Sequence, residues 1–257
     1  MSDYLMRAGA PISEETWSKI DDMVVTVAQK ALVGRKFLEI AGPMGWGVQV
    51  APRFGFGTED GAFTAQSADY IRLTELASEF KLKAQHLAIA DQTSHGLDLG
   101  AVAMAAVALT RHEDELIVGG LMKAAEHESA LGDWAAMGQP FGAVSRAIAT
   151  LRQAGIEEPF ALVLNPKLYA ELASLMQHGR REMAMVESVV KAGVFQYPDM
   201  PADKALLVGS SAWNADIVLG QDVATAYLGN EGLDHRFRIF ETLALRIKRP
   251  ASICVLA

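Results

Sequence analysis

The residues best suited to acid–base or metal chemistry are the six histidines, and their neighbours form no known ligand pattern. None has a glutamate three positions earlier, so the helical Glu-x-x-His pair of di-iron bundles is absent, and no His-Glu-x-x-His zinc helix occurs. His112 with Glu115, and the acids beside His127, could hold a surface metal, but a solvated polar face fits both better. We therefore predict no metal site. The histidines are His86, His95, His112, His127, His178 and His235.

Phosphate-binding and nucleophile motifs are also missing. The glycine-rich run at 55–61 has the wrong spacing for a dinucleotide fingerprint, so it predicts a hairpin tip. The run at 209–213 lacks the second glycine of a nucleophile elbow. Cys254 lies in an apolar segment, which predicts a buried, unreactive thiol. Residue chemistry alone therefore predicts no catalytic residue, and a stand-alone enzyme is the least favoured class.

The composition is that of a folded, acidic protein. The chain has 257 residues, and its 51% hydrophobic content excludes global disorder. A net charge of −8 argues against nucleic acid and against an anionic membrane as partners. A single cysteine excludes an intrachain disulfide. The most apolar window, 99–109, is too short for the roughly 20 residues that span a bilayer, so we predict a cytoplasmic protein.

The first helix has the clearest signals. Ser13 can accept from the first-turn amides, and the acids that follow it suit the positive end of the helix. Gly34 is expected to end this helix in a left-handed conformation. A short strand over 36–40 and a turn over 42–47 should follow. The predicted buried stripe, with spacings of three and four, consists of Trp17, Ile20, Val24, Val27 and Ala31.

The middle of the chain mixes extended and helical segments in no regular order. Residues 48–74 are punctuated by glycine and proline, which predicts a long two-stranded arm. An alanine-rich helix should run over 98–119 with Asp98 as its cap. Further helices are expected over 141–154, 167–177 and 183–192, and strands over 158–164, 205–208, 217–219, 225–228, 237–247 and 252–256. This pattern predicts an α+β fold and not a doubly wound sheet.

Two stretches are more specific than any of these motifs. The first is 34–47, which reads GRKFLEIAGPMGWG, and the second begins at 219–227 with LGQDVATAY and continues through FET at 240–242 to RP at 249–250. Both resemble the encapsulin shell proteins, the family also called linocin-type bacteriocins. HEDELI at 112–117 and GIEEPF at 155–160 fit the same family in the same order. The resemblance covers nearly the whole chain.

The resemblance implies the fold of tailed-phage major capsid proteins of the Hong Kong phage type. Its expected parts are an N-terminal helix with the start of the peripheral domain, an extended loop, the peripheral domain with its spine helix, an axial domain, and the C-terminal strands of the peripheral domain. In that order they are expected at 1–47, 48–76, 77–134, 135–217 and 218–257. An exposed two-stranded arm is unstable alone, so a neighbouring subunit is expected to cover it.

The implied function is that of a closed icosahedral nanocompartment. The first expected partner is the chain itself, in about 60 copies or a multiple. The second is a cargo enzyme, commonly a ferritin-like iron-oxidising protein or a dye-decolourising peroxidase, which docks on the inner wall through a C-terminal targeting peptide; iron storage is one expected role. Some members bind flavin beside an aromatic residue after the extended loop. Lys83, Ala84 and Gln85 stand there instead, so no cofactor is predicted.

The resemblance also implies a cargo dock near the first helix and the strand after it. The expected docking residues are Arg35, Glu39 and Ile40, with Ala28 and Thr225 as weaker candidates. The family often has a bulkier apolar side chain in place of Ala28 and an aspartate in place of Glu39. Under the alternative interpretation, Ile40 belongs to the core and Arg35 pairs with Glu39.

A pore at the five-fold axis is the second implied site. In the family, the tip of the axial domain surrounds this axis, and here the tip falls between the helices expected at 167–177 and 183–192. An ordinary exposed turn between helices is the alternative. The expected pore residues are Gln177, His178, Gly179, Arg180, Arg181 and Glu182.

A viral or prophage major capsid protein is the alternative function. Such chains commonly carry an N-terminal scaffolding segment that is removed on maturation. This sequence begins almost directly with its first helix, which favours the encapsulin interpretation.

Overall fold

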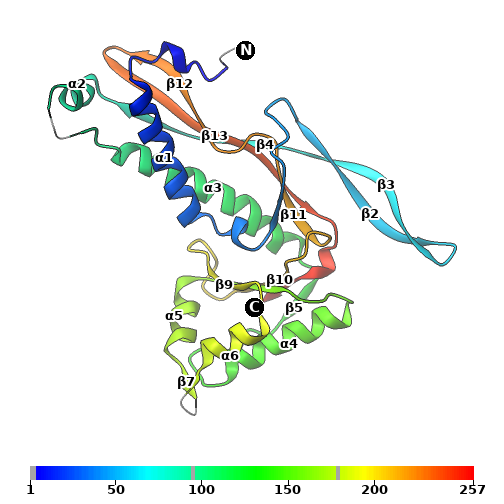
Figure 1. Ribbon diagram of the computed structural model, residues 1–257. Helices are drawn as coiled ribbons and strands as arrows, with labels where there is room; N and C mark the ends of the chain where they lie inside the picture. The colour runs from blue at the N-terminus through cyan, green and yellow to red at the C-terminus, as the bar shows by residue number, and fades with distance from the viewer. Residues whose placement is uncertain (1–3, 94–95, 178–179) are drawn as a thin grey trace.

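The computed structural model describes residues 4–93, 96–177 and 180–257, and two mixed sheets form its framework (Figure 1). In the first sheet the long strand β13 pairs with β11 and β12 along one edge and with β4 along the other, and β1 pairs with the outer edge of β11. These strands are β1 (Glu39–Ala41), β4 (Thr74–Leu82), β11 (Ala215–Leu219), β12 (Ala224–Glu231) and β13 (Asp234–Ile247).

Two helices cover one face of the first sheet, and their apolar stripes build its core. In α1 (Glu14–Ala31), Trp17 and Ile20 are buried as predicted, and Trp17 packs edge-on against Phe237 of β13 with ring centroids 5.5 Å apart. The long helix α3 (Gly100–Ala124) lies beside α1 (Figure 1). Asp98 accepts a hydrogen bond from the Gly100 amide at 2.8 Å. Both predicted helices are present, but the second runs from Gly100 to Ala124, and its N-terminal cap is Leu99 and not Asp98.

The prediction for α1 is correct at its N-terminus and wrong at its C-terminus. The Ser13 hydroxyl accepts from the Thr16 amide at 3.2 Å, so the predicted cap is confirmed. The prediction for Gly34 is wrong: α1 ends at Ala31, and Gly34 lies in the short 3₁₀ helix η2 (Gly34–Lys36) without a left-handed φ. A glycine is needed there for space, because a Cβ atom on Gly34 would lie 2.8 Å from Ile117 of α3.

The second sheet has helices on one face and α3 with the first sheet on the other. Its strands β6 (Phe160–Leu164) and β10 (Ala205–Gly209) are buried along their whole length, as strands covered on both faces should be. Leu162 and Leu207 face the helices, whereas Val163 and Leu206 pack with Ile117 of α3. The remaining elements are β5 (His127–Ser129), β9 (Gly193–Gln196), β14 (Ile253–Leu256), α4 (Gln139–Gln153), α5 (Pro166–Ser174) and α6 (Glu182–Val189).

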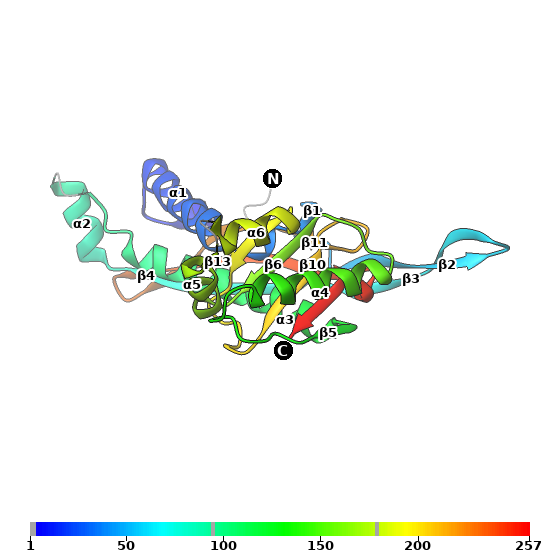
Figure 2. The ribbon, with the colours of Figure 1, turned by 90° about the horizontal axis from the view of Figure 1, so that it is seen from below.

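A long hairpin projects away from both sheets, as Figures 1 and 2 show. It consists of β2 (Val50–Glu59) and β3 (Ala62–Arg72), which confirms the predicted arm. Asp60 and Gly61 form its turn with φ values of 50° and 77°, the conformation that favours Asp-Gly at a two-residue hairpin turn. At the base, Arg246 Nη1 donates to the Pro52 carbonyl at 2.9 Å and ties the arm to β13.

The arm has one apolar face. Phe54 and Phe56 alternate along β2, and the residues opposite them in the hairpin are alanines. Phe56, Phe63 and Tyr70 are 53%, 91% and 65% exposed, so this face is largely uncovered in a single chain. Trp213, which is 59% exposed, lines an open pocket of about 560 Å³ together with Phe56 and Phe63.

The short elements complete the chain. Helix α2 (Ala84–Gln92) lies at the end opposite the arm (Figure 2). The helix predicted over 167–177 stops at Ser174, because β7 (Met176–Gln177) pairs with β8 (Arg180–Arg181) in a small hairpin. The other 3₁₀ turns are η1 (Arg7–Gly9) and η3 (Pro250–Ser252). Within the described ranges, no helix is long and apolar enough to cross a membrane.

The boundaries proposed from the sequence cut across this framework in two places. The second sheet draws most of its strands from the segment expected at 135–217, yet β5 and β14 join it from outside that range. Strand β11 begins inside the range but belongs to the first sheet.

Candidate functional site

A groove lies between the exposed side of α1 and the turn that precedes β12. Its volume is about 340 Å³. Three positions of α1 and its C-terminal cap, Leu32, line one wall at spacings of three and four. The opposite wall comes from the turn at 222–223. An apolar wall with charged groups at its edge suits a peptide side chain. The lining residues are Val25, Ala28, Gln29, Leu32, Arg35, Lys36, Asp222 and Val223.

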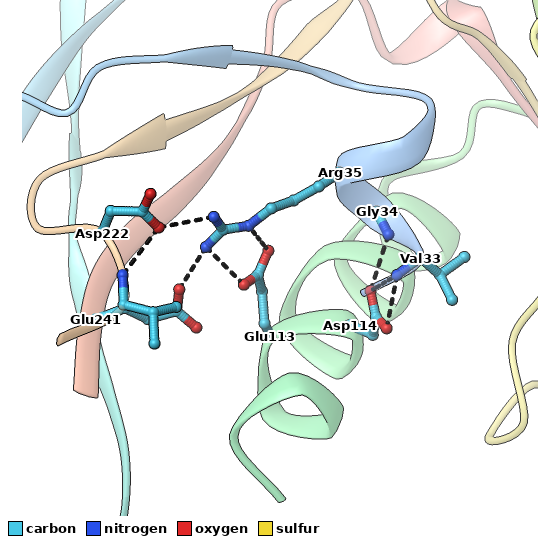
Figure 3. Close-up of polar contacts among 8 residues, drawn as sticks. Val33, Gly34, Arg35, Glu113, Asp114, Asp222 and Glu241 are labelled. Atoms are coloured by element: carbon cyan, nitrogen blue, oxygen red, sulfur yellow. Dashed lines mark hydrogen bonds and ion pairs between the residues drawn. The ribbon is translucent and has the colours of Figure 1, made fainter. Parts of the chain in front are cut away.

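Arg35 ties one end of this groove to three other elements (Figure 3). Its Nε and Nη2 atoms donate to the two oxygens of Glu113 on α3 at 2.8 and 2.9 Å. Nη2 also donates to Glu241 of β13 at 2.5 Å, and Nη1 donates to Asp222 at 2.8 Å. Burial would lower the pKa of Arg35, but the hydrogen bond and charge of Glu113 outweigh it and raise the pKa well above its usual range.

The two glutamates beneath Arg35 are fully buried, whereas Asp222 reaches solvent at the rim. The side chains of Glu113 and Glu241 are 0% exposed, and that of Asp222 is 52% exposed. Burial, reinforced by the negative charge of Glu113, raises the pKa of Glu241 to about 9. One guanidinium therefore pairs with three carboxyl groups, and two of the three are fully buried.

Asp114 holds the chain where α1 turns into η2. Its carboxylate accepts from the amides of Val33 and Gly34 at 2.8 to 3.0 Å (Figure 3). Burial raises the pKa of Asp114 to about 6, although these two amide donors favour its ionised form. Neighbouring residues of α3, Glu113 and Asp114, thus fix both the side chain of Arg35 and the backbone before it.

The comparisons with known proteins decide the family. A family model described as an encapsulating protein for peroxidase matches residues 1–244. The chain belongs to the encapsulin shell family. It is 33% identical to the type 1 encapsulin shell protein of Myxococcus xanthus, covering 100% of this chain and 97% of that one. It is 32% identical to a diheme-cytochrome–encapsulin shell fusion protein of Kuenenia stuttgartiensis, covering 95% and 73%.

Solved structures agree on the fold. The virus-like particle from Pyrococcus furiosus matches with a TM-score of 0.84 and 24% identity, over 95% of this chain and 100% of that chain. The capsid of Myoviridae phage XM1 matches with a TM-score of 0.59 and 14% identity, over 85% and 88%. The α+β fold is that of encapsulins and tailed-phage capsid proteins of the Hong Kong type, as predicted. The chain is thus a structural shell protein of a capsid-like nanocompartment.

The encapsulin fold distributes the five expected docking residues over three environments. Ala28 and Arg35 line the groove, and Thr225 is buried, with its backbone carbonyl accepting from Arg7 Nε at 3.0 Å. Glu39 and Ile40 are exposed on the edge strand β1, outside the groove lining. Ile40 is 44% exposed and so is not a core residue, and Arg35 pairs with Glu113, Asp222 and Glu241 and not with Glu39.

Sequence reasoning missed most of the groove wall, although one signal for it was present. Val25, Ala28 and Leu32 form a second series at spacings of three and four, offset by one position from the buried stripe through Val24. Asp222 carried no local signal, because its partner Arg35 lies 187 positions away.

Of the expected pore residues, the described ones lie in β7, in β8 and at the start of α6. Arg181 is exposed, whereas Glu182 is fully buried and accepts from the amides of Gly138 and Phe141 at 2.9 and 3.0 Å. Glu182 therefore anchors the start of α4. His178 and Gly179 lie outside the described residues. The backbones of Gln177 and Arg180 pair with each other.

The other chemical groups are structural. Cys254 is buried in β14 as predicted, and burial raises the pKa of its thiol to about 11. Over residues 4–93, 96–177 and 180–257, no three His, Cys, Asp or Glu side chains lie together in a way that could hold a metal ion.

Replacing Glu182 with alanine should destabilise the fold. The substitution leaves the partly buried amides of Gly138 and Phe141 without their acceptor, which should cost about 1–3 kcal/mol and lower the thermal unfolding midpoint. Glu187→Ala, at an exposed position of the same helix, is the matched control and should change little. Equal midpoints for the two variants would contradict the anchoring role.

Proposed function

We propose that this encapsulin closes into an icosahedral shell of about 60 subunits or a multiple in the cytoplasm and encloses a cargo enzyme. The observation that carries this proposal is the whole-chain match at 33% identity to an encapsulin shell protein. The phage capsid XM1 shares the fold at 14% identity, so the encapsulin function is favoured over the viral one.

The uncovered face of the arm supports assembly through a second copy of the chain. A two-stranded ribbon with aromatic side chains in water is unstable by itself, and burying each such side chain contributes roughly 1.5–3 kcal/mol. Phe54, Phe56, Phe63 and Tyr70 present such a face. Contact with a neighbouring subunit would remove it from water and order the arm.

Placing a charge on the apolar arm face should block assembly. In Phe56→Asp the carboxylate would be buried against a neighbouring subunit, which is unfavourable without a partner charge. Sedimentation velocity should show particles of megadalton size for the wild type and small species for the variant, with unchanged far-UV circular dichroism. Thr64→Asp lies on the opposite face and should still assemble. A stable 27.6 kDa wild-type monomer at micromolar concentration would refute the shell function itself.

The proposed cargo is a ferritin-like iron-oxidising protein or a dye-decolourising peroxidase. The family description names a peroxidase, and a Pyrococcus furiosus relative is a ferritin-like–encapsulin shell fusion. With separate chains, a C-terminal targeting peptide would bring the cargo to the shell. The groove beside α1 is the dock that we propose for that peptide, with Ala28 and Arg35 in its wall. Glu39 and Ile40, exposed on β1, remain candidates outside this lining, whereas Thr225 is buried and is not proposed to touch the peptide.

A single dock should bind weakly, and cargo multiplicity should compensate. Each apolar side chain of the peptide that the groove buries contributes roughly 1.5–3 kcal/mol, but association and ordering of the peptide oppose much of this. Several peptides on one oligomeric cargo particle raise the effective concentration of the others once one is bound. Retention should therefore respond steeply to changes in a single groove residue.

Charges at the dock should release cargo from intact shells. Val25→Asp places a carboxylate in the groove wall, and Ile40→Asp tests the strand position predicted from the sequence. Losing one buried apolar contact should weaken retention on the order of tenfold or more, since 1.4 kcal/mol is tenfold. Co-purification of shells with cargo of the classes proposed above measures this loss. Leu233→Asp, on the exposed β12–β13 turn, is the control.

The two dock variants separate the possible outcomes. Normal cargo loading in intact Val25→Asp shells would remove the groove from consideration. If Val25→Asp loses cargo and Ile40→Asp retains it, the dock is confined to the groove. Failure of Ile40→Asp to assemble would mean that β1 serves shell contacts.

The β7–β8 hairpin is our proposed pore tip. It lies beside the helices of the second sheet, at the end of the molecule away from the first sheet (Figure 1). Arg181 is exposed there. Glu182 is excluded from the lining because it is buried. Repetition of Arg181 around a five-fold axis would favour small anions, and protonation of His178 at low pH would strengthen this preference.

Removing the Arg181 charge should reduce anion entry. Influx is measured as quenching of a fluorophore inside assembled shells, with iodide as the anion and caesium as the cation. Iodide should enter the wild type faster, and Arg181→Gln should narrow the difference. Lys167→Gln, an exposed change on α5, should leave it unchanged. Equal entry of both ions in the wild type would rule out a charge-selective pore.

A further inference from the structure

The charge balance beneath the groove is unusual. Three carboxyl groups surround the Arg35 guanidinium, and two of them, on Glu113 and Glu241, are completely buried. If all three were ionised, the cluster would carry a net charge of −2 largely out of water. An uncompensated buried charge is strongly unfavourable, so such a group usually takes up a proton instead.

Two observations place that proton between Glu113 and Glu241. The carboxyl groups of Glu113 and Glu241 converge on one atom, because both accept from Nη2 of Arg35, at 2.9 and 2.5 Å, and two ionised carboxylates held this close in a buried place repel each other. In addition, Oε1 of Glu241 is buried and receives no hydrogen bond from any residue that the structure describes. A proton on this pair supplies the missing donor.

We propose that Glu113 and Glu241 share one proton under the groove, and that its loss at alkaline pH loosens the wall formed by Arg35 and Asp222. The shared proton is inferred from the structure of one subunit. Any effect that it has on cargo loading rests on the proposed dock. While the proton is shared, the two glutamates carry one negative charge between them, and Arg35 also holds Asp222 through Nη1. In the deprotonated state a second buried anion competes for the same guanidinium.

The surroundings offer no other cation among the described contacts of Glu241. Helix α3 contributes Glu113 and, one residue further, Asp114; η2 contributes Arg35; and the turn before β12 contributes Asp222. The positive charge of Lys36 is near Asp114, where it favours the ionised form of that carboxyl group. The residue paired with Glu241 on β4 is the apolar Leu76.

The direction of the pH effect follows from the pKa of Glu241. Burial, with the charge of Glu113, raises this pKa from 4.5 to about 9, so the folded chain binds the proton more tightly than the unfolded chain. The stability that the proton provides is complete below the unfolded pKa and is lost as the pH rises through the folded pKa. Asp222 also accepts from the Val223 amide at 2.8 Å, so weakening its bond to Arg35 should free the turn that lines the groove.

Infrared spectroscopy of empty assembled shells tests the shared proton directly. The wild type at about pH 7.5, above the pKa of Asp114 and below that of Glu241, should show the C=O band of a protonated carboxyl group. Glu241→Gln and Glu113→Gln should each remove this band, because the remaining buried carboxyl group no longer has a second one beside it and ionises against the guanidinium. Glu75→Gln, on the same sheet and 37% exposed, should retain it. A band that survives either buried substitution would overturn the proposal.

The effect on the groove wall is measured on the same shells from about pH 6 to about pH 10, a range that spans the Glu241 pKa of about 9. In the wild type, the thermal midpoint should fall by several degrees, and amide exchange at 219–224, corrected for intrinsic rates, should rise. Glu241→Gln keeps a neutral side chain and should flatten both responses. If it responds to pH as the wild type does, or if 219–224 stays equally protected, the pH-dependent wall is refuted. Neither readout involves cargo, so failure of the dock would leave this result standing.

Discussion

The bonds of Arg35 are the constraint on which the groove depends. A guanidinium fixes its donors in one plane, so three carboxyl groups from different parts of the chain must meet it in a defined geometry. Glu113 comes from α3, Glu241 from β13 and Asp222 from the turn before β12. Arg35 lies in η2, four residues after the last residue of α1, so this cluster holds the segment that follows that helix against α3, β13 and the turn that lines the groove.

Helix α3 transmits the same constraint to the rest of the molecule. Its N-terminal half packs with α1 and β13 through Val102 and Leu109, and its C-terminal half packs with the second sheet through Ile117 and Leu121. Glu113 and Asp114 lie between these halves and hold Arg35 and the η2 backbone. One rigid helix thus serves both cores and the groove, which suits a subunit that must keep its shape in a shell.

The arm follows the opposite principle. Among the described contacts, its strands pair with each other, Arg246 holds Pro52 at the base, and its aromatic face is left in water. A part of this kind gains its stability from association and not from its own chain. The subunit therefore combines a body that is complete by itself with an arm that is complete only in the assembly.

The sequence by itself determined the elements and the family. The cap at Ser13, the stripe through Trp17 and Ile20, and the Asp60-Gly61 turn are local signals. Caps, periodicity and turn conformations depend on residues only a few positions apart, so the sequence contains them directly. The ordered motifs from 34 to 250 then identified the encapsulin shell family.

Only the tertiary structure decided what the charged residues do. The partners of Arg35 lie 78, 187 and 206 positions away, and Glu182 meets its amide donors about 40 positions back, at separations of 41 and 44. Ile40 is exposed because β1 is an edge strand, and this too depends on the order of the strands in the sheet. Whether a carboxyl group is buried, paired or protonated depends on which distant segments exclude water from it, and no local pattern encodes that packing.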